Sequence, residues 1–203
     1  MTNIDRRSKT DILPLVLLLI TLICTNAFSQ QPIAKVNGEL KQLKIAFVTG
    51  NEMKAREIQL MLSEHSTIQD SNSNSSRVEL KVLNVDLPEI QEVNTEGIAK
   101  AKAILGAQLA GGACVVEDTS LHLTALGGMP GPYIKWFDKQ LGAEGLYKIL
   151  NAFDDKSATA VCTLAFCSAP HDDPVMFTGE VTGRIVAPVE GRGERWDSVF
   201  VPD

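Results

Sequence analysis

The sequence is poor in the residue types that build structural metal sites. It contains four cysteines and three histidines, and the cysteines form no C-x-x-C pair, which argues against structural zinc. Cys114, Cys162 and Cys167 lie in strand-like apolar stretches, where thiols usually pack as small hydrophobic groups. The alternative, a cysteine nucleophile activated beside His122, requires an unusually reactive thiol.

The sequence also lacks an excess of positive charge. It has 19 lysines and arginines against 25 aspartates and glutamates, which gives a net charge of −6. Such a chain has no field to hold a nucleic-acid backbone, so nucleic acid is not an expected partner, although clustered lysines can still bind a small anion. Hydrophobic residues make up 44% and charged residues 22%, as in a globular protein with one α/β domain.

The one long hydrophobic run, at residues 12–24, is shorter than the about 20 residues that span a bilayer. Basic residues precede it, and Ala27 and Ser29 after it fit the small-residue pattern of a signal-peptide cleavage site. We interpret the run as signal-like, with a membrane anchor or an extension that the folded domain ignores as alternatives. Residues 1–40 are therefore expected to lie outside the domain, which begins at residue 43 and extends to residue 203.

Hydrophobic periodicity and turn residues from Leu43 onward predict alternating strands and helices. Strands are expected at 43–48, 78–87, 113–116, 158–167 and 175–186, and helices at 52–65, 94–109, 133–137 and 144–153. The polar stretch 70–76 is typical of an exposed loop. This order favours an α/β fold in which helices flank a mixed sheet.

Polar residues gather where the predicted strands end, and open α/β folds bind ligands there. Thr49, Gly50 and Asn51 follow the first strand at a helix N-terminus, which attracts anions, and Lys54 lies one turn further on. The spacing is not that of a Walker A loop, and a plain capped turn is the alternative.

Three carboxylates, Glu89, Glu117 and Asp118, are expected at other strand ends. Carboxylates suit Mg²⁺, which also accepts substrate phosphates and can orient a water. The alternative for Glu89 and Glu117 is a solvated charge at a strand end, which is the commoner fate of acidic residues beside turns. Asp118 directly follows a buried-type strand, where a carboxylate needs a partner or a function. Three lysines are expected on or at the start of helices: Lys54, Lys102 and Lys135. Taken alone, each would more often be a surface residue. Together with the helix N-terminus and the carboxylates, they describe a pocket for a metal-bound polyphosphate.

Several motifs together resemble the inosine triphosphate pyrophosphatase family, and its eukaryotic branch most. They are Thr49-Gly50-Asn51-x-x-Lys54, Leu87-Pro88-Glu89, Val116-Glu117-Asp118-Thr119, the run from Leu126 to Phe137 (LGGMPGPYIKWF), Asp155-Lys156-Ser157-Ala158, the run from Gly183 to Pro188 (GRIVAP), and Trp196-Asp197. The resemblance covers residues 43–203.

The resemblance implies hydrolysis of non-standard purine nucleoside triphosphates (ITP, dITP, XTP) to the monophosphate and pyrophosphate with Mg²⁺. It implies an elongated α/β fold with a mixed sheet, two lobes and a central active-site cleft, assembled as a homodimer. It also implies a cytoplasmic location, and membrane contact is expected only if the N-terminal apolar segment is retained.

The same resemblance implies a set of site residues. Glu89 and Asp118 would hold the metal, and Asp118 would be the catalytic residue that orients or deprotonates the attacking water. Substrate contacts would come from Thr49, Gly50, Asn51, Glu52, Met53, Lys54, Lys102, Asp118, Thr119, Ser120, Leu121, Lys135, Glu194, Arg195, Trp196 and Asp197.

The sequence departs from the family pattern near its end. Where the family has Phe-Gly-Trp-Asp-Pro, this chain has Glu194-Arg195-Trp196-Asp197-Ser198, so a bulky charge replaces glycine beside the base. Relatives continue past the position of Asp203 through a Ser-His-Arg motif and a helix, so the domain is expected to be incomplete. The alternatives are a related pyrophosphatase with altered base preference and a catalytically impaired nucleotide-binding relative.

Overall fold

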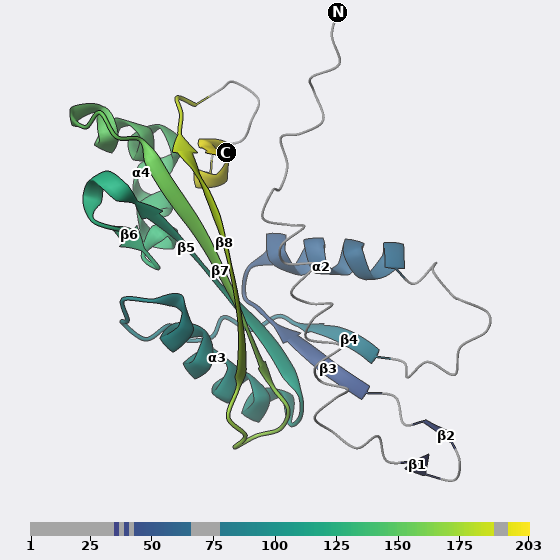
Figure 1. The fold of residues 1–203 in the computed structure, drawn as a ribbon. Coiled ribbons are helices and arrows are strands. Elements are labelled where there is room, and N and C mark those ends of the chain that lie inside the picture. Colours follow the sequence, from purple (N-terminus) through teal and green to yellow (C-terminus); the bar gives the residue numbers. More distant parts are fainter. Residues whose placement is uncertain (1–34, 37–38, 41–42, 66–77, 189–194) are drawn as a thin grey trace, which may run out of the picture.

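A seven-stranded mixed sheet forms the centre of the fold (Figure 1). The computed structural model describes residues 35–36, 39–40, 43–65, 78–188 and 195–203. Within the sheet the strands are β3 (Leu43–Val48), β4 (Val78–Leu83), β5 (Cys114–Leu123), β6 (Pro130–Gly131), β7 (Ser157–Cys167), β8 (Val175–Ile185) and β9 (Phe200–Pro202). A separate antiparallel pair is formed by β1 (Lys35–Val36) and β2 (Glu39–Leu40).

The sheet is parallel on one side and antiparallel on the other. Its order is β4-β3-β5-β7-β8-β9, with β6 paired to β5. β3 runs parallel to β4 and β5, whereas β7 runs antiparallel to both β5 and β8. The result is an open mixed α/β sheet, as the order of elements predicted.

The helices are α2 (Glu52–His65), α3 (Thr95–Ala110) and α4 (Ile134–Ile149), with short 3₁₀ turns η1 (Thr124–Leu126), η2 (Leu150–Ala152) and η3 (Trp196–Ser198). The capping residues define α3 as predicted. The Asn94 side chain accepts from the Gly97 N–H, and Gly111 ends the helix in the left-handed region at φ 65°.

The helices α2 and α3 cover opposite faces of the sheet. Ile58 of α2 packs with Ile45, Phe47 and Val115, while small residues of α3, Ala99 among them, pack against the other face. Successive side chains of a strand point to opposite faces, so neighbouring residues of β5 face different helices. Figure 1 shows α4 beside the long strands β5, β7 and β8, at the end of these strands that lies away from α2 and α3.

The predicted end of β5 was wrong. The strand was expected to stop at Val116, but it continues to Leu123, so Glu117 and Asp118 lie within it and not at its tip. The reason is pairing with β7, which places Glu117 opposite Leu164 and Asp118 opposite Thr163. Polar residues resemble a strand end in sequence, but a neighbouring strand can still carry them in its ladder.

Other boundaries also differ. The strand at 78–87 ends at Leu83, and the two helices expected around residues 133–153 form α4, interrupted by non-helical Gly142 (φ 63°), followed by η2. The predicted loop 70–76 and the apolar run 12–24 lie outside the described residues. Within the described part of the chain, no helix has the length and apolarity needed to cross a membrane.

Candidate active site

The turn between β3 and α2 is capped by its own side chains. Asn51 Oδ1 accepts from the backbone N–H groups of Met53 (3.0 Å) and Lys54 (3.3 Å), and Thr49 Oγ1 accepts from the Asn51 N–H (3.1 Å). Gly50 is required because a Cβ there would lie 2.6 Å from the Cα of Asp86. The turn is therefore capped by side chains, and three of its N–H groups, those of Asn51, Met53 and Lys54, are bonded within it.

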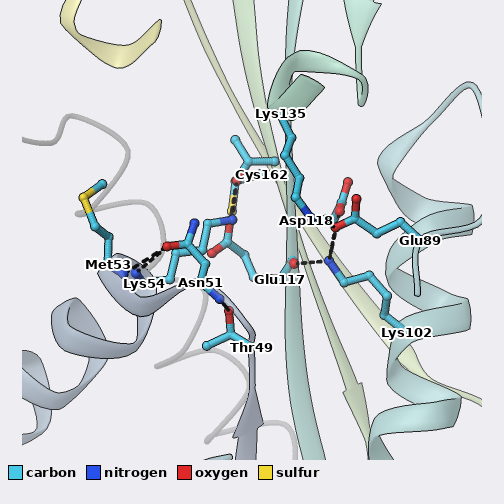
Figure 2. Close-up of polar contacts among 11 residues, drawn as sticks. Thr49, Asn51, Met53, Lys54, Glu89, Lys102, Glu117, Asp118, Lys135 and Cys162 are labelled. Carbon is cyan, nitrogen blue, oxygen red and sulfur yellow. Dashed lines mark hydrogen bonds and ion pairs between the residues drawn. The ribbon is translucent and has the colours of Figure 1, made fainter. Parts of the chain in front are cut away.

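On the face of the sheet covered by α2, Lys54 and Glu117 form an ion pair. Lys54 Nζ lies 2.7 Å from Glu117 Oε1 and 3.4 Å from Thr119 Oγ1, and the Thr119 hydroxyl also donates to the Glu117 carboxylate (Figure 2). Burial raises the pKa of Glu117, but the Lys54 ammonium and these hydrogen bonds outweigh it and hold the pKa below its usual range. Burial likewise lowers the pKa of Lys54, and Glu117 outweighs it, so the net shift is upward.

On the opposite face, Lys102 of α3 lies between two carboxylates (Figure 2). Its Nζ lies 3.1 Å from Asp118 Oδ1 and 3.4 Å from Glu89 Oε1, and it donates to the Glu117 carbonyl at 3.0 Å. Lys135 of α4 reaches the same Glu89 oxygen at 3.5 Å and Asp86 Oδ1 at 3.8 Å. Residues from four separate parts of the chain, the segment after β4, α3, β5 and α4, thus meet around one acidic centre.

Asp118 is the least satisfied group of this centre. The residue is 7% exposed, and its Oδ2 atom is buried without a hydrogen-bond partner among the described residues. Burial raises the pKa of Asp118, and the Lys102 ammonium offsets this only in part. A buried oxygen with free lone pairs is a position for a cation or a water to bind.

The carboxylates of this centre suit a magnesium ion better than a transition metal. The described residues contain no group of three or more histidine, cysteine or acidic side chains that could hold a metal. Asp118 and Glu89 both contact the Lys102 ammonium, so two carboxylates converge on one point. Mg²⁺ commonly takes one or two carboxylates and fills its other positions with water and phosphate oxygens, and this donor set fits that pattern.

The other predicted substrate residues fall in different places. Ser120 and Leu121 are fully buried, with the Ser120 hydroxyl 2.8 Å from His122 Nε2 and Leu121 in the core. Glu52 pairs with Arg56 on the exposed surface of α2, and Met53 is about half exposed. The structure therefore places Lys54 and Thr119 beside Glu117 on one face of the sheet, and Lys102, Glu89 and Lys135 near Asp118 on the other. Ser120 and Leu121 lie in the interior.

The predicted base-binding residues lie in η3, which packs against α4. The Trp196 N–H donates to Asp138 Oδ1 at 2.9 Å, and Asp197 is exposed. Arg195 Nε lies 3.1 Å from Asp138 Oδ2. Glu194 lies outside the described residues.

Three residues that contact the expected site residues were not among the site residues predicted from the sequence: Asp86, Asp138 and Trp136. Trp136 is 51% exposed, the ammonium groups of Lys135 and Lys139 lie 5.7 and 5.6 Å from its ring, and it lines a shallow pocket beside Glu89. Trp136 lies within the motif from Leu126 to Phe137. Its place in a motif specific to the family could have identified it as a candidate site residue. Asp86 and Asp138 had no such signal, because each is defined by a distant partner.

The buried cysteines are core residues, as expected. The Cys162 thiol contacts Glu117 Oε1 at 3.7 Å. The pKa of Cys162 is raised, mainly by burial and secondly by the Glu117 charge. Burial raises the pKa of Cys114 to about 12. His122 is bonded to Ser120. A thiolate nucleophile is not supported, because burial outweighs the contacts that favour the charged form and the net pKa shift of each thiol is upward.

The Glu117–Lys54 pair predicts a pH-dependent stability. A Glu117→Gln variant is expected to have a free energy of unfolding about 2 kcal/mol lower than that of the parent at pH 7, because Lys54 loses a hydrogen bond to a charged group. The folded-state pKa of Glu117 lies below its ordinary value of 4.5, so its contribution is complete above that pH and is lost as the pH falls through the folded-state pKa. Urea unfolding of the parent and the variant at pH 7 and at about pH 3.5 measures the difference in their unfolding free energies. An equal difference at both pH values would exclude this origin.

Comparisons with known proteins identify the family. Residues 45–203 match the model of the Ham1 family. The chain is 42% identical to an inosine triphosphate pyrophosphatase of Puccinia graminis over 78% of this chain and 79% of the relative, and 44% identical to one of Tuber melanosporum over 76% and 77%. A nucleoside-triphosphatase (dITP/XTP pyrophosphatase) structure from Mycobacterium abscessus is similar with a TM-score of 0.58 at 27% identity, covering 79% of this chain and 83% of that one. A HAM1 protein structure from Coxiella burnetii, 23% identical with a TM-score of 0.60 over 78% and 81% of the two chains, shares the fold. From its sequence and its fold alike, the chain belongs to the Ham1 family.

Proposed function

We propose that this protein hydrolyses non-standard purine nucleoside triphosphates, ITP, dITP and XTP, to the monophosphate and pyrophosphate. The observation that carries the proposal is Asp118 Oδ2, a buried carboxylate oxygen without a partner among the described residues, in a centre that also holds Glu89 and Lys102. The printed names of the relatives, inosine triphosphate pyrophosphatase and dITP/XTP pyrophosphatase, support the substrate class.

In this proposal Glu89 and Asp118 would hold Mg²⁺, which would supply Lewis-acid chemistry to a phosphoryl oxygen and positive charge to the leaving pyrophosphate. Lys102 and Lys135 contribute fixed positive charge on the same face of the site, and Lys54 contributes it from the other. Their pre-arranged ammonium groups stabilise the charge that builds on the phosphates without reorganising during the reaction. Asp118 accepts a hydrogen bond from the attacking water and orients it.

The base is proposed to lie against Trp196 and Asp197. Recognition of hypoxanthine requires hydrogen bonds to its 6-oxo group, and the 6-amino group of adenine would leave those donors unpaired. Arg195 stands beside Trp196, which favours altered base preference as the second candidate function.

The functional assay is pyrophosphate release from ITP, XTP, GTP and dATP, with and without Mg²⁺. Turnover of ITP and XTP that needs Mg²⁺ and exceeds turnover of dATP is expected. Faster turnover of GTP or dATP would instead support altered base preference. Binding of triphosphates without release of pyrophosphate would support an impaired nucleotide-binding relative.

A Glu89→Gln variant is expected to need more Mg²⁺. The amide keeps the size of the side chain but removes the charge that attracts the ion, so half-maximal activity should require about tenfold more Mg²⁺, the scale on which even outer-shell partners of a metal act. A titration of ITP turnover with Mg²⁺ measures the shift. The matched control is Glu92→Gln, whose Oε1 accepts from the Val93 N–H in the neighbouring loop and which should titrate like the parent.

We further propose a homodimer formed by a domain at residues 43–203, acting in the cytoplasm where nucleoside triphosphates are pooled. Light scattering measures the mass of the assembly. Cell fractionation shows whether the apolar run at residues 12–24 directs the chain elsewhere.

A further inference from the structure

The turn that contains Trp196 and Asp197 is attached to α4 through one carboxylate. Both oxygens of Asp138 are used: Oδ1 accepts from the Trp196 backbone N–H at 2.9 Å, and Oδ2 lies 3.1 Å from Arg195 Nε. Asp138 is 57 positions earlier in the chain than Arg195, so this contact links two distant segments. The contact from the Trp196 N–H to Asp138 holds the backbone of η3 at the first residue of that turn.

The indole ring of Trp196 is held separately. It lies edge-on to Phe200 of β9, with ring centroids 6.3 Å apart and planes at 60°. Phe200 is buried in the core cluster that includes Ile185 and Leu146. Trp196 is therefore fixed at two points, its backbone by a carboxylate and its ring by the core.

The charged head of Arg195 is turned toward α4 by the same carboxylate. The Arg195 side chain is half-exposed, whereas that of Asp138 is buried. Burial raises the pKa of Asp138, with the Arg195 guanidinium and the Trp196 N–H lowering it in part. The bulky residue expected beside the base thus has a defined direction, which is set by Asp138.

A purely stabilising purpose explains this arrangement poorly. Burying a carboxylate costs several kcal/mol per ion, and an ion pair with one exposed partner returns little of it. An apolar residue at position 138 would avoid this cost among the neighbours of α4 that line the core, such as Ile134 and Leu146. What the carboxylate adds is a fixed geometry for two consecutive residues, because it uses a different oxygen for each.

We infer that Asp138 is a positioning residue for base recognition, which holds the Arg195–Trp196–Asp197 segment in place and keeps the Arg195 side chain clear of the base. This inference rests on the proposed function, since it assigns base contact to Trp196 and Asp197. Asp138 acts through those residues and is not itself expected to touch the substrate.

The test compares three variants with a matched control. Asp138→Ala removes both contacts, Asp138→Asn retains an acceptor for the Trp196 N–H but loses the charge, and Arg195→Ala removes only the ion pair. Glu144→Gln is the control, because it weakens the exposed Glu144–Lys148 pair (2.6 Å) on the same helix. The readouts are kcat and KM for ITP and GTP, and the dissociation constant for IMP by calorimetry.

Asp138→Ala is expected to raise KM for ITP and the dissociation constant for IMP about tenfold, the cost of a hydrogen bond to a charged group, while kcat changes by less than about threefold. Asp138→Asn should recover most of this loss. Arg195→Ala should change the ratio of kcat/KM between ITP and GTP, because without the guanidinium the segment is held by the Trp196 N–H contact with Asp138 alone. Glu144→Gln should match the parent in every value.

The outcomes separate this inference from the proposed function. If the parent hydrolyses ITP and Asp138→Ala leaves both KM and the ITP-to-GTP ratio unchanged, the inference is wrong and the function stands. If the parent binds IMP but hydrolyses nothing, the reaction is wrong, and the dissociation constants decide the inference. A parent that binds no purine nucleotide overturns both. Should Asp138→Ala fail to fold, Asp138→Asn and Arg195→Ala still decide it, because the first keeps the acceptor and the second alters an exposed side chain.

Discussion

An Asp118→Asn variant is expected to lose about a thousandfold in kcat for Mg²⁺-dependent release of pyrophosphate from ITP, the middle of the range for loss of a positioned acid–base group. Asparagine keeps the size of the side chain and one carbonyl oxygen. It has neither the charge to hold a divalent cation nor the basicity to orient and deprotonate a water. The loss should therefore fall on kcat and not on the fold.

A pyrophosphate assay at saturating ITP and Mg²⁺ measures this change, and thermal unfolding of the same samples verifies that the variant is folded. Asp154→Asn serves as the control, because Asp154 is an exposed aspartate in the turn before β7 and should leave kcat unchanged. A folded Asp118→Asn protein with kcat within about tenfold of the parent would move the reaction away from Asp118, because the loss would fall below the usual effect of a positioned group.

Replacing Lys102 by methionine should cost about 3 kcal/mol of unfolding free energy at pH 7, the effect of leaving one member of a buried ion pair without its partner. The Lys102 side chain is only 12% exposed, and its ammonium lies 3.1 Å from Asp118 Oδ1 and 3.4 Å from Glu89 Oε1. Methionine keeps an unbranched side chain of similar length but leaves both carboxylates without the ammonium group. The cost should shrink as the pH falls, because Asp118 then takes up a proton and the buried charge disappears.

Lys100→Met is the matched control on the same helix. Lys100 is half-exposed and lies 3.5 Å from the exposed Asp173, so its loss should change the unfolding free energy by less than about 1 kcal/mol. Chemical denaturation at pH 7 and at lower pH measures both variants. A second variant, Lys102→Met with Asp118→Asn, should recover part of the loss. Equal stability of the Lys100 and Lys102 variants would mean that Asp118 and Glu89 are satisfied in another way.

The sequence was sufficient for the elements that depend on local chemistry. The strand at 43–48, the helix at 52–65 and the cap at Asn94 follow from periodicity and from side chains that bond to backbone two or three residues away, and each agrees with the structure. The motif resemblance likewise indicated the family that the comparisons confirm. In both cases the information lies in residues close together in the chain.

The site was predictable only as a list of residues. Glu117 and Asp118 are adjacent in sequence, and both were expected at one strand tip. Within β5 they point to opposite faces, so Glu117 meets Lys54 of α2 and Asp118 meets Lys102 of α3. One carboxylate is neutralised in a tight pair, while the other keeps a free buried oxygen.

The sequence by itself determined the fold class, the bounds of α2, the cap of α3 and the residue types of the acidic centre. The helix bounds and the cap arise from interactions between near neighbours in the chain. The tertiary structure alone decided that β5 continues beside β7, that Asp118 keeps a buried oxygen without a partner among the described residues, and that Asp138 bonds the first residue of η3. Each of these depends on contacts between segments that are separated in the chain, such as the pairing of Asp118 with Thr163 and the hydrogen bond from Trp196 to Asp138. Such a partner becomes a neighbour only when the sheet pairs and the helices pack, and no local pattern carries that information.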